Sequence, residues 1–312
     1  MDAFHSFDVV DNDPDPYPDD EGTNWLPKSH GTRCAGQIAM VANNSLCGVG
    51  VAPDVNIAGI RLLSGPLYDY KEAKALSFKQ QGIDIYSSSW GPRDNGKTIE
   101  GPGPLAKAAI YTGVTKGRGG KGNIYVWASG NGGERQDSCA FDGYVSSPYT
   151  VGVGSVSDEM DVTSFSEPCA AIITASVSGW NNGKYSVVTT DLAGKCTTSH
   201  GGTSASAPFV SGAIALAIEA ERRLTWRDVQ HLLVLTSNPD TLKPKSNWTT
   251  NAAGHRVHPY FGFGLLDVYA LVKGARQWYS WPNYGLGDRM FCRYDFIHVK
   301  LVRPAQMNRL YK

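Results

Sequence analysis

The hydrophobic residues of this chain alternate between short, nearly continuous apolar runs and longer stretches with helical spacing. Apolar runs bounded by turn-forming residues are typical of strands buried on both faces, and four are found, at residues 55–63, 83–87, 123–128 and 149–156. Residues 70–80 and 103–114, which lie between these runs, have the spacing of helices. This order predicts an α/β fold, with a parallel sheet flanked by helices in a three-layer αβα arrangement.

The C-terminal half of the chain predicts three further helices. Residues 204–220 are apolar on nearly every face, as expected for a helix buried at the centre of a domain. A second helix is expected to begin after Thr225 and run to Thr236, because Asp228 stands where a capping box needs an acceptor. The third covers residues 264–275. After Trp278 the hydrophobic residues no longer follow helix or strand spacing, so we interpret residues 1–278 as one folded domain and 279–312 as a tail.

Charge and composition exclude several classes of function. The 29 Lys and Arg residues balance 29 Asp and Glu residues, which does not favour a nucleic-acid partner. No apolar run approaches the length of a membrane span, and no signal peptide is predicted at this N-terminus. The acid-rich first 27 residues, without Lys or Arg, are typical of a solvated acidic tail. The glycosylation patterns Asn43-Asn-Ser45 and Asn247-Trp-Thr249 favour a secretory setting.

The cysteines argue against a zinc ribbon or a thioredoxin-type motif, because none of the six belongs to a Cys-x-x-Cys pair. Spacing alone leaves all fifteen pairings of six cysteines open. The cysteines are Cys34, Cys47, Cys139, Cys169, Cys196 and Cys292.

Three short motifs are candidates for chemistry, and each also has an ordinary structural interpretation. His30 opens a predicted helix in HGTRCAG, where a lone histidine is more often a surface or core residue than a catalyst. Ser204 lies in GGTSASAP where a loop meets the buried helix, a position typical of an N-cap but also of a nucleophile near free backbone N–H groups. Asn131 in ASGNGG follows an apolar strand, as a turn residue or as a donor to an oxyanion.

Together the motifs HGTRCAG, SSWGP, ASGNGG and HGGTSASAP resemble, in this order, the subtilase superfamily and specifically the kexin/furin branch of proprotein convertases. The resemblance extends from about residue 6 to residue 278. It implies that Ser204 is the nucleophile and His30 the general base of a serine endopeptidase. Asn131 and the backbone N–H of Ser204 would form the oxyanion hole.

The resemblance also implies a cleft that selects basic residues in precursor proteins. Asp94 and Asp142 match the acids that bind the Arg or Lys before the scissile bond, and Glu72 and Glu100 match those that bind residues further upstream. Ser89, Trp90 and Gly91 match the strand edge that pairs with an extended substrate. Tyr144 is a further expected substrate-binding residue.

Calcium is the implied cofactor, at three sites made of oxygen ligands. The first matches a loop that would use Val41, Asn44, Leu46 and Gly48. The second matches Asp94, Asp137 and Glu167, and the third matches Asp8, Asp13 and Asp15. The family pattern also pairs Cys47 with Cys196 and Cys139 with Cys169, leaving Cys34 free and Cys292 without a counterpart.

The chain departs from the family at one critical position, because the triad aspartate should precede the acidic run on an apolar strand. None of Asp2, Asp8 and Asp11 follows such a strand, so we expect residues 1–312 alone to lack useful protease activity. Two interpretations stay open: an incomplete endoprotease, or a non-catalytic isoform that binds basic peptides or a partner. A full-length form would work in the Golgi or be secreted, with an inhibitory propeptide and a P domain that these residues lack.

Overall fold

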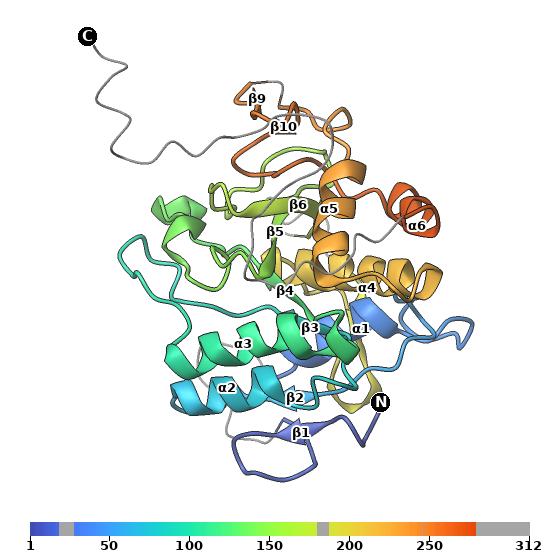
Figure 1. Cartoon of the computed structure of the whole chain (residues 1–312). Helices are drawn as coiled ribbons and strands as arrows, with labels where there is room; N and C mark the ends of the chain where they lie inside the picture. Colours follow the sequence, from blue (N-terminus) through green and yellow to red (C-terminus); the bar gives the residue numbers. More distant parts are fainter. Residues whose placement is uncertain (19–27, 180–186, 245, 279–312) are drawn as a thin grey trace.

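A four-stranded parallel sheet forms the centre of the molecule. The computed structural model describes residues 1–18, 28–179, 187–244 and 246–278. The strands follow one another in the order β3 (Ile85–Ser88), β4 (Ile124–Ala128), β5 (Thr150–Val156) and β6 (Ile172–Val177), and every adjacent pair is parallel. Helices lie on both faces (Figure 1). The predicted three-layer α/β architecture is therefore confirmed.

The alternation of side chains along β4 explains why the sheet needs two helical layers. Ile124, Val126 and Ala128 belong to one hydrophobic cluster, whereas Tyr125 and Trp127 belong to another. Successive side chains of a strand point to opposite faces, so this fully buried strand supplies both cores.

One helical layer consists of α2 (Asp69–Ser77) and α3 (Pro104–Lys116), which pack on each other and on the face with Tyr125 and Trp127. The other is centred on α4 (Thr203–Ala220), which contacts all four strands of the sheet. Beside α4 lie α1 (His30–Ala39) and α6 (Val268–Arg276), and α5 (Trp226–Thr236) contacts α6 and β6. An apolar helix of 18 residues has the length and hydropathy of a membrane span, but 67% of α4 is buried inside this fold.

Local capping sets the helix boundaries. The side chain of Thr225 accepts from the Asp228 N–H and the Asp228 carboxylate accepts from the Thr225 N–H, which completes the predicted capping box. The last helix was predicted from residue 264 but begins at Val268, because the Asp267 side chain caps it by accepting from the Ala270 N–H.

Two strand predictions need correction. Of the predicted strand 55–63 only β2 (Ile60–Arg61) forms, because its sole strand partner in the described structure is the two-residue β1 (Phe7–Asp8), in parallel. Strand β6 was not predicted, although four of its six residues are buried.

Short elements complete the described chain. Two antiparallel pairs are formed by β7 (Thr189–Thr190) with β8 (Cys196–Thr197) and by β9 (Thr249–Thr250) with β10 (Arg256–Val257). Four 3₁₀ turns are η1 (Arg118–Gly120), η2 (Gly133–Arg135), η3 (Cys139–Phe141) and η4 (Leu192–Gly194).

Candidate active site

Ser204 lies in the first turn of α4, and a proline four residues later changes how its backbone is bonded. Pro208 has no N–H, so the carbonyl of Ser204 cannot receive the usual intrahelical hydrogen bond. That carbonyl accepts instead from Ser89 Oγ at 3.1 Å and from Cys34 Sγ at 3.5 Å. The serine backbone is thereby tied to the predicted cleft edge and to helix α1.

His30 is the first residue of α1, which packs beside α4. The side chain of Gln37 links the two helices by donating to the carbonyl of Ala205 at 3.0 Å. Cys34 Sγ lies 3.9 Å from His30 Nδ1. The structure thus places His30 and Ser204 on adjoining helix starts around one sulfur atom, although no hydrogen bond joins the two side chains within the described residues.

The imidazole of His30 is neutral around pH 7. Burial, assisted by the positive charge of Arg33, lowers its pKa to about 4. The ring centroid of His200 is 5.7 Å from that of His30. Burial lowers the pKa of His200 to about 4, with smaller contributions from His30 and Arg33. A neutral imidazole can accept a proton, as a general base must. In the described part of the chain no carboxylate is hydrogen-bonded to His30; the nearby Asp191 pairs with Arg33.

Asn131 is held in one orientation by the start of α4. Its Oδ1 accepts from the Thr203 backbone N–H at 2.8 Å and from Thr203 Oγ1 at 3.1 Å. Gly202, with φ +71°, lies so close that a Cβ there would be 2.8 Å from Asn131 Oδ1. The Asn131 side chain is also hydrogen-bonded to the Asp94 carboxylate. An amide nitrogen carries two N–H donors, so the second one suits the predicted role at an oxyanion.

Asp142 presents one carboxylate oxygen to the predicted cleft. Its Oδ1 accepts from the backbone N–H groups of Tyr144 and Val145, at 2.7 and 3.2 Å. The other oxygen faces Gly91, where a Cβ would approach it to 2.9 Å. Burial, with the negative charges of Asp94 and Asp137, raises the pKa of Asp142 to about 7 despite those two hydrogen bonds.

A single pocket brings Asp142 together with three other predicted acids, Asp94, Asp137 and Glu167. Burial raises the pKa of Asp94, and Asp137 adds to the shift. Burial raises the pKa of Glu167 to about 8, with contributions from the three neighbouring carboxylates. Neighbouring negative charges thus add to burial in disfavouring ionisation of Asp94, Asp142 and Glu167, and a cationic group in the pocket would relieve that repulsion.

Glu72, Glu100 and the aromatic residues form the next part of the wall. Tyr144 Oη donates to the buried Glu72 carboxylate at 2.7 Å, and burial is the main cause that raises the pKa of Glu72. Tyr144 also packs edge-on against Trp90, with ring centroids 5.0 Å apart. Glu100 forms a parallel bridge with Asp142. These contacts link residues of the two predicted acidic subsites: Tyr144 bonds to Glu72, and Asp142 bridges to Glu100.

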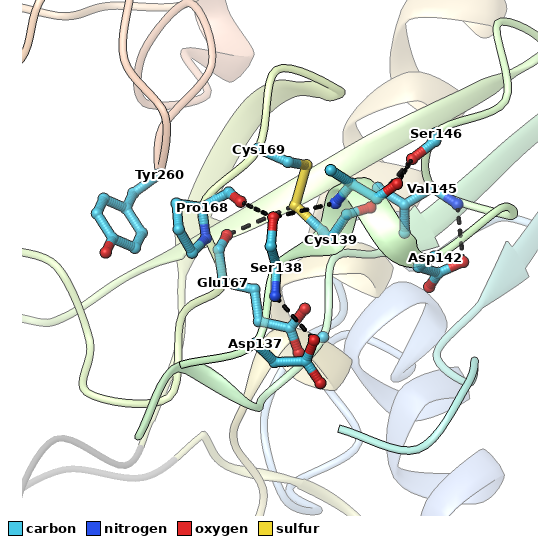
Figure 2. Close-up of a disulfide and its surroundings, with 12 residues drawn as sticks. Asp137, Ser138, Cys139, Asp142, Val145, Ser146, Glu167, Pro168, Cys169 and Tyr260 are labelled. Carbon is cyan, nitrogen blue, oxygen red and sulfur yellow. Dashed lines mark hydrogen bonds between the residues drawn. A yellow bond between two sulfur atoms is a disulfide. The ribbon is translucent and has the colours of Figure 1, made fainter. Parts of the chain in front are cut away.

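Two disulfides join segments that are distant in sequence. Cys47 is bonded to Cys196 and Cys139 to Cys169, so both expected pairings are confirmed. The second disulfide anchors the loop that carries Asp137 and Asp142 (Figure 2). Cys34 is the free cysteine of the described residues, and burial raises its pKa to about 12, so it remains a thiol at neutral pH. Cys292 lies outside the described residues.

Comparison with known proteins identifies the family. A sequence model of the subtilase family matches residues 2–264. The chain belongs to the subtilase family. It is 51% identical over 277 residues to Furin-1 of Xenopus laevis, which covers 89% of this chain and 35% of the relative. It is 50% identical over 273 residues to Furin of Homo sapiens, covering 88% of this chain and 34% of the relative, which supports a furin-type subtilase.

Solved structures agree with this assignment of the fold. A crystal structure of the serine protease of Aeromonas sobria superposes with a TM-score of 0.76 at 22% identity, covering 89% of this chain and 57% of that one. The chain spans about a third of the length of the two furins.

The predicted calcium residues of this subtilase differ in how well they fit a cation. Asp137 and Glu167 direct their carboxylates toward the same space (Figure 2), next to the Asp94 carboxylate in the pocket. Oxygen-rich, mutually repelling carboxylates fit a hard cation. Backbone N–H groups already occupy part of this set, since Gly96 donates to Asp137 and Gly132 to Glu167. Across the described ranges, no group of three or more Asp, Glu, His or Cys side chains is arranged so that it could hold a metal ion as it stands.

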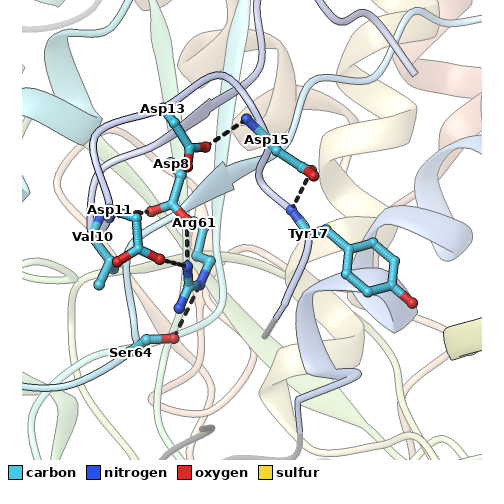
Figure 3. Close-up of polar contacts among 8 residues, drawn as sticks. All are labelled: Asp8, Val10, Asp11, Asp13, Asp15, Tyr17, Arg61 and Ser64. Atoms are coloured by element: carbon cyan, nitrogen blue, oxygen red, sulfur yellow. Dashed lines mark hydrogen bonds and ion pairs between the residues drawn. The ribbon is translucent and has the colours of Figure 1, made fainter. Parts of the chain in front are cut away.

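The third predicted calcium site has a different occupant in this structure. The buried Asp8 carboxylate is paired with the guanidinium of Arg61, which also contacts Asp11 (Figure 3). Asp13 and Asp15 accept from backbone N–H groups two residues ahead of them. A cation bound here would have to compete with an arginine for Asp8, so this site fits calcium less well than the pocket of Asp94 and Glu167.

The first predicted calcium loop is strongly curved. Asn43, Ser45 and Cys47 all have positive φ, between 52° and 61°. Asn44 Oδ1 accepts from the Leu46 N–H, and the Leu46 carbonyl accepts from the Gly48 N–H. The side chains of Val41 and Leu46 carry no ligand atom, so a ligand from either residue would be its backbone carbonyl.

Several residues that build the site were not predicted. Thr203 orients Asn131, Pro208 frees the Ser204 carbonyl, and His200 lies beside His30. All three stand within four residues of Ser204 in the HGGTSASAP motif. A proline inside an otherwise helical pattern was a readable signal of a carbonyl without its intrahelical partner.

Proposed function

We propose that this region supplies the nucleophile, base and specificity pocket of a calcium-dependent serine endopeptidase. Its substrates are precursor proteins that are cleaved after Arg or Lys in the secretory pathway. The observation that carries the proposal is the pocket in which the carboxylates of Asp94, Asp137, Asp142 and Glu167 outnumber a single lining cation, Arg93. Buried carboxylates without cations are costly, and a substrate guanidinium or ammonium group offsets that cost.

The chemistry follows from the positions of three side chains. Ser204 Oγ attacks the carbonyl carbon of the basic residue while His30 accepts the hydroxyl proton. The proton then passes to the leaving amine, and water repeats the sequence to release the acyl group. The Asn131 amide nitrogen and the Ser204 N–H stabilise the oxyanion that forms in each step. Calcium, held by Asp94, Asp137 and Glu167, would neutralise charge behind the specificity pocket.

Cofactor, partner and compartment are part of the same proposal. Two disulfides and the exposed sequon residues Asn43 and Asn247 support a secretory setting, Golgi or extracellular. An inhibitory propeptide, itself ending in basic residues, would occupy the same cleft before activation.

A second function is favoured by one observation at His30. Its Nδ1 lies near the thiol of Cys34, and the charge that acts on the ring is that of Arg33, where a triad would place a carboxylate. Without that carboxylate the imidazolium intermediate is poorly stabilised. The same residues would then form a non-catalytic site that binds basic peptides or a partner with a basic segment.

One experiment separates these functions. Residues 1–312 and a Ser204→Ala variant would be mixed with an Arg-Xaa-Lys-Arg fluorogenic peptide and with its Gln-substituted counterpart in millimolar calcium. Hydrolysis of the basic peptide alone, absent in the variant, supports the endopeptidase. Binding of the basic peptide without hydrolysis supports the second function. If the two peptides are hydrolysed or bound equally well, both functions are contradicted.

A further inference from the structure

The acidic cleft wall ends in an exposed aromatic and aliphatic surface at the starts of α2 and α3. We call Leu67, Tyr68, Tyr70 and Leu105 the tyrosine patch. Their exposed fractions are 38%, 52%, 58% and 53%. The rings of Tyr68 and Tyr70 are stacked, with centroids 5.9 Å apart and planes 12° from parallel. A stacked, solvent-exposed tyrosine pair next to a cleft is a preformed apolar contact surface.

The tyrosine patch is continuous with the acidic cleft on both sides. Asp69, between the two tyrosines, accepts from the backbone N–H groups of Leu105 and Ala106, at 3.0 and 2.8 Å. From Leu105 the chain leads back to Glu100, which forms a bridge with Asp142. On the other side, the carbonyl of Tyr68 accepts from the Glu72 N–H at 3.1 Å, so patch and Glu72 share one helical turn.

The charges around the tyrosine patch favour an apolar occupant. Both oxygens of Asp69 are used to cap α3, and Gly103 packs so closely that a Cβ there would be 2.3 Å from the Asp69 carboxylate carbon. The acid is therefore committed to the fold. The preferred substrate side chain therefore changes from a basic one at Glu72 to an apolar one at the tyrosine patch.

The spacing gives the substrate position. Tyr68 precedes Glu72 by four residues, a rise of about 6 Å along a helix. An extended peptide advances about 3.3 Å per residue and returns to the same side every second residue. We propose that the tyrosine patch binds a bulky apolar side chain two residues upstream of the residue selected by Glu72 and Glu100. The proposal rests on the proposed function, since the occupant is the upstream segment of the precursor substrate.

The test uses hexapeptides of sequence Xaa-Ala-Arg-Ala-Lys-Arg, labelled through an N-terminal spacer, with Phe, Ser or Arg at Xaa. Fluorescence anisotropy would measure their Kd for the full chain carrying Ser204→Ala, which prevents turnover. Partial burial of a phenylalanine ring should make the Phe peptide about fivefold to tenfold tighter than the Ser peptide. A Tyr68→Ser/Tyr70→Ser variant should lose this advantage. Tyr269→Ser, which removes a tyrosine that is 76% exposed on α6, should keep it.

The outcomes distinguish this proposal from the function on which it rests. If no hexapeptide binds, or if binding survives replacement of every Arg and Lys by Gln, the proposed function fails and the subsite with it. If basic hexapeptides bind but Phe and Ser are equivalent, or Arg is the tightest, only the apolar subsite is refuted. The comparison between peptides needs no variant of the patch, so a folding defect in the double variant would not obscure the result.

Discussion

Removing the charge of Asp142 should abolish a pH dependence that the structure predicts for binding of basic peptides. Burial raises the pKa of this carboxyl to about 7, and a bound arginine needs it ionised. A carboxyl with that pKa is about 1% ionised at pH 5 and about 90% ionised at pH 8. If only the ionised form binds, affinity should therefore rise roughly 90-fold over this range. Below pH 7, binding should release a proton.

Asp142→Asn is a suitable perturbation because the amide oxygen can still accept from the N–H groups of Tyr144 and Val145. Loss of a buried charge partner costs about 2–5 kcal/mol, so affinity at pH 8 should fall at least about 30-fold. Below pH 6 the variant and the wild type should converge, because the wild-type carboxyl is then protonated. The curve of the variant should be much flatter than that of the wild type and should keep only the pH dependence contributed by Glu167 and Asp94, whose pKa values in the same pocket are also raised.

The assay is fluorescence anisotropy with an end-capped Arg-Xaa-Lys-Arg peptide, from pH 5 to pH 8. A chelator would be included, because a cation near Asp94 would lower the pKa of Asp142. The nearby His30 and His200, with pKa values of about 4, stay largely neutral across this range. Asp54→Asn, on the exposed surface, is the matched control and should behave as the wild type. A wild-type affinity independent of pH, or an unchanged slope in Asp142→Asn, would refute the reasoning.

Three further predictions concern the same region. Asn131→Asp keeps the acceptor for Thr203 and removes the amide donor, so in peptide-hydrolysis assays kcat should fall about 10²–10³-fold with KM little changed; an effect confined to KM would contradict the oxyanion role. Glu167 has a raised pKa of about 8, so its contribution to stability is present below about pH 4.5 and is lost as pH rises toward 8. Thermal melts should therefore show that calcium raises Tm more at pH 8 than at pH 5, and that Glu167→Gln removes most of this difference; equal calcium shifts at both pH values would argue against the site. Replacing Cys139 and Cys169 by Ala opens a loop closed across 30 residues, which should cost about 3–4 kcal/mol in urea denaturation, and an unchanged midpoint would contradict it.

The amino-acid sequence determined those parts of the fold that depend on short-range patterns. The capping box at Thr225 involves residues three positions apart, so the start of α5 was predicted correctly. The apolar run 123–128 indicated a strand buried on both faces, which is what β4 is. The run 55–63 had a similar composition but pairs only at Ile60–Arg61, because strand formation depends on a partner that composition does not reveal.

For the site, the sequence alone supplied the chemically capable residues and, through the family resemblance, both disulfide pairings. Only the tertiary structure decided their environments. The Ser204 carbonyl meets Ser89 and Cys34, which are 115 and 170 positions away in sequence. The raised pKa of Asp142 arises from burial and from carboxylates that include Asp94 on a separate segment, and Asp8 faces an arginine 53 positions away. Contacts of this range depend on how the layers pack, and electrostatic shifts depend on burial, so neither can be read from local patterns.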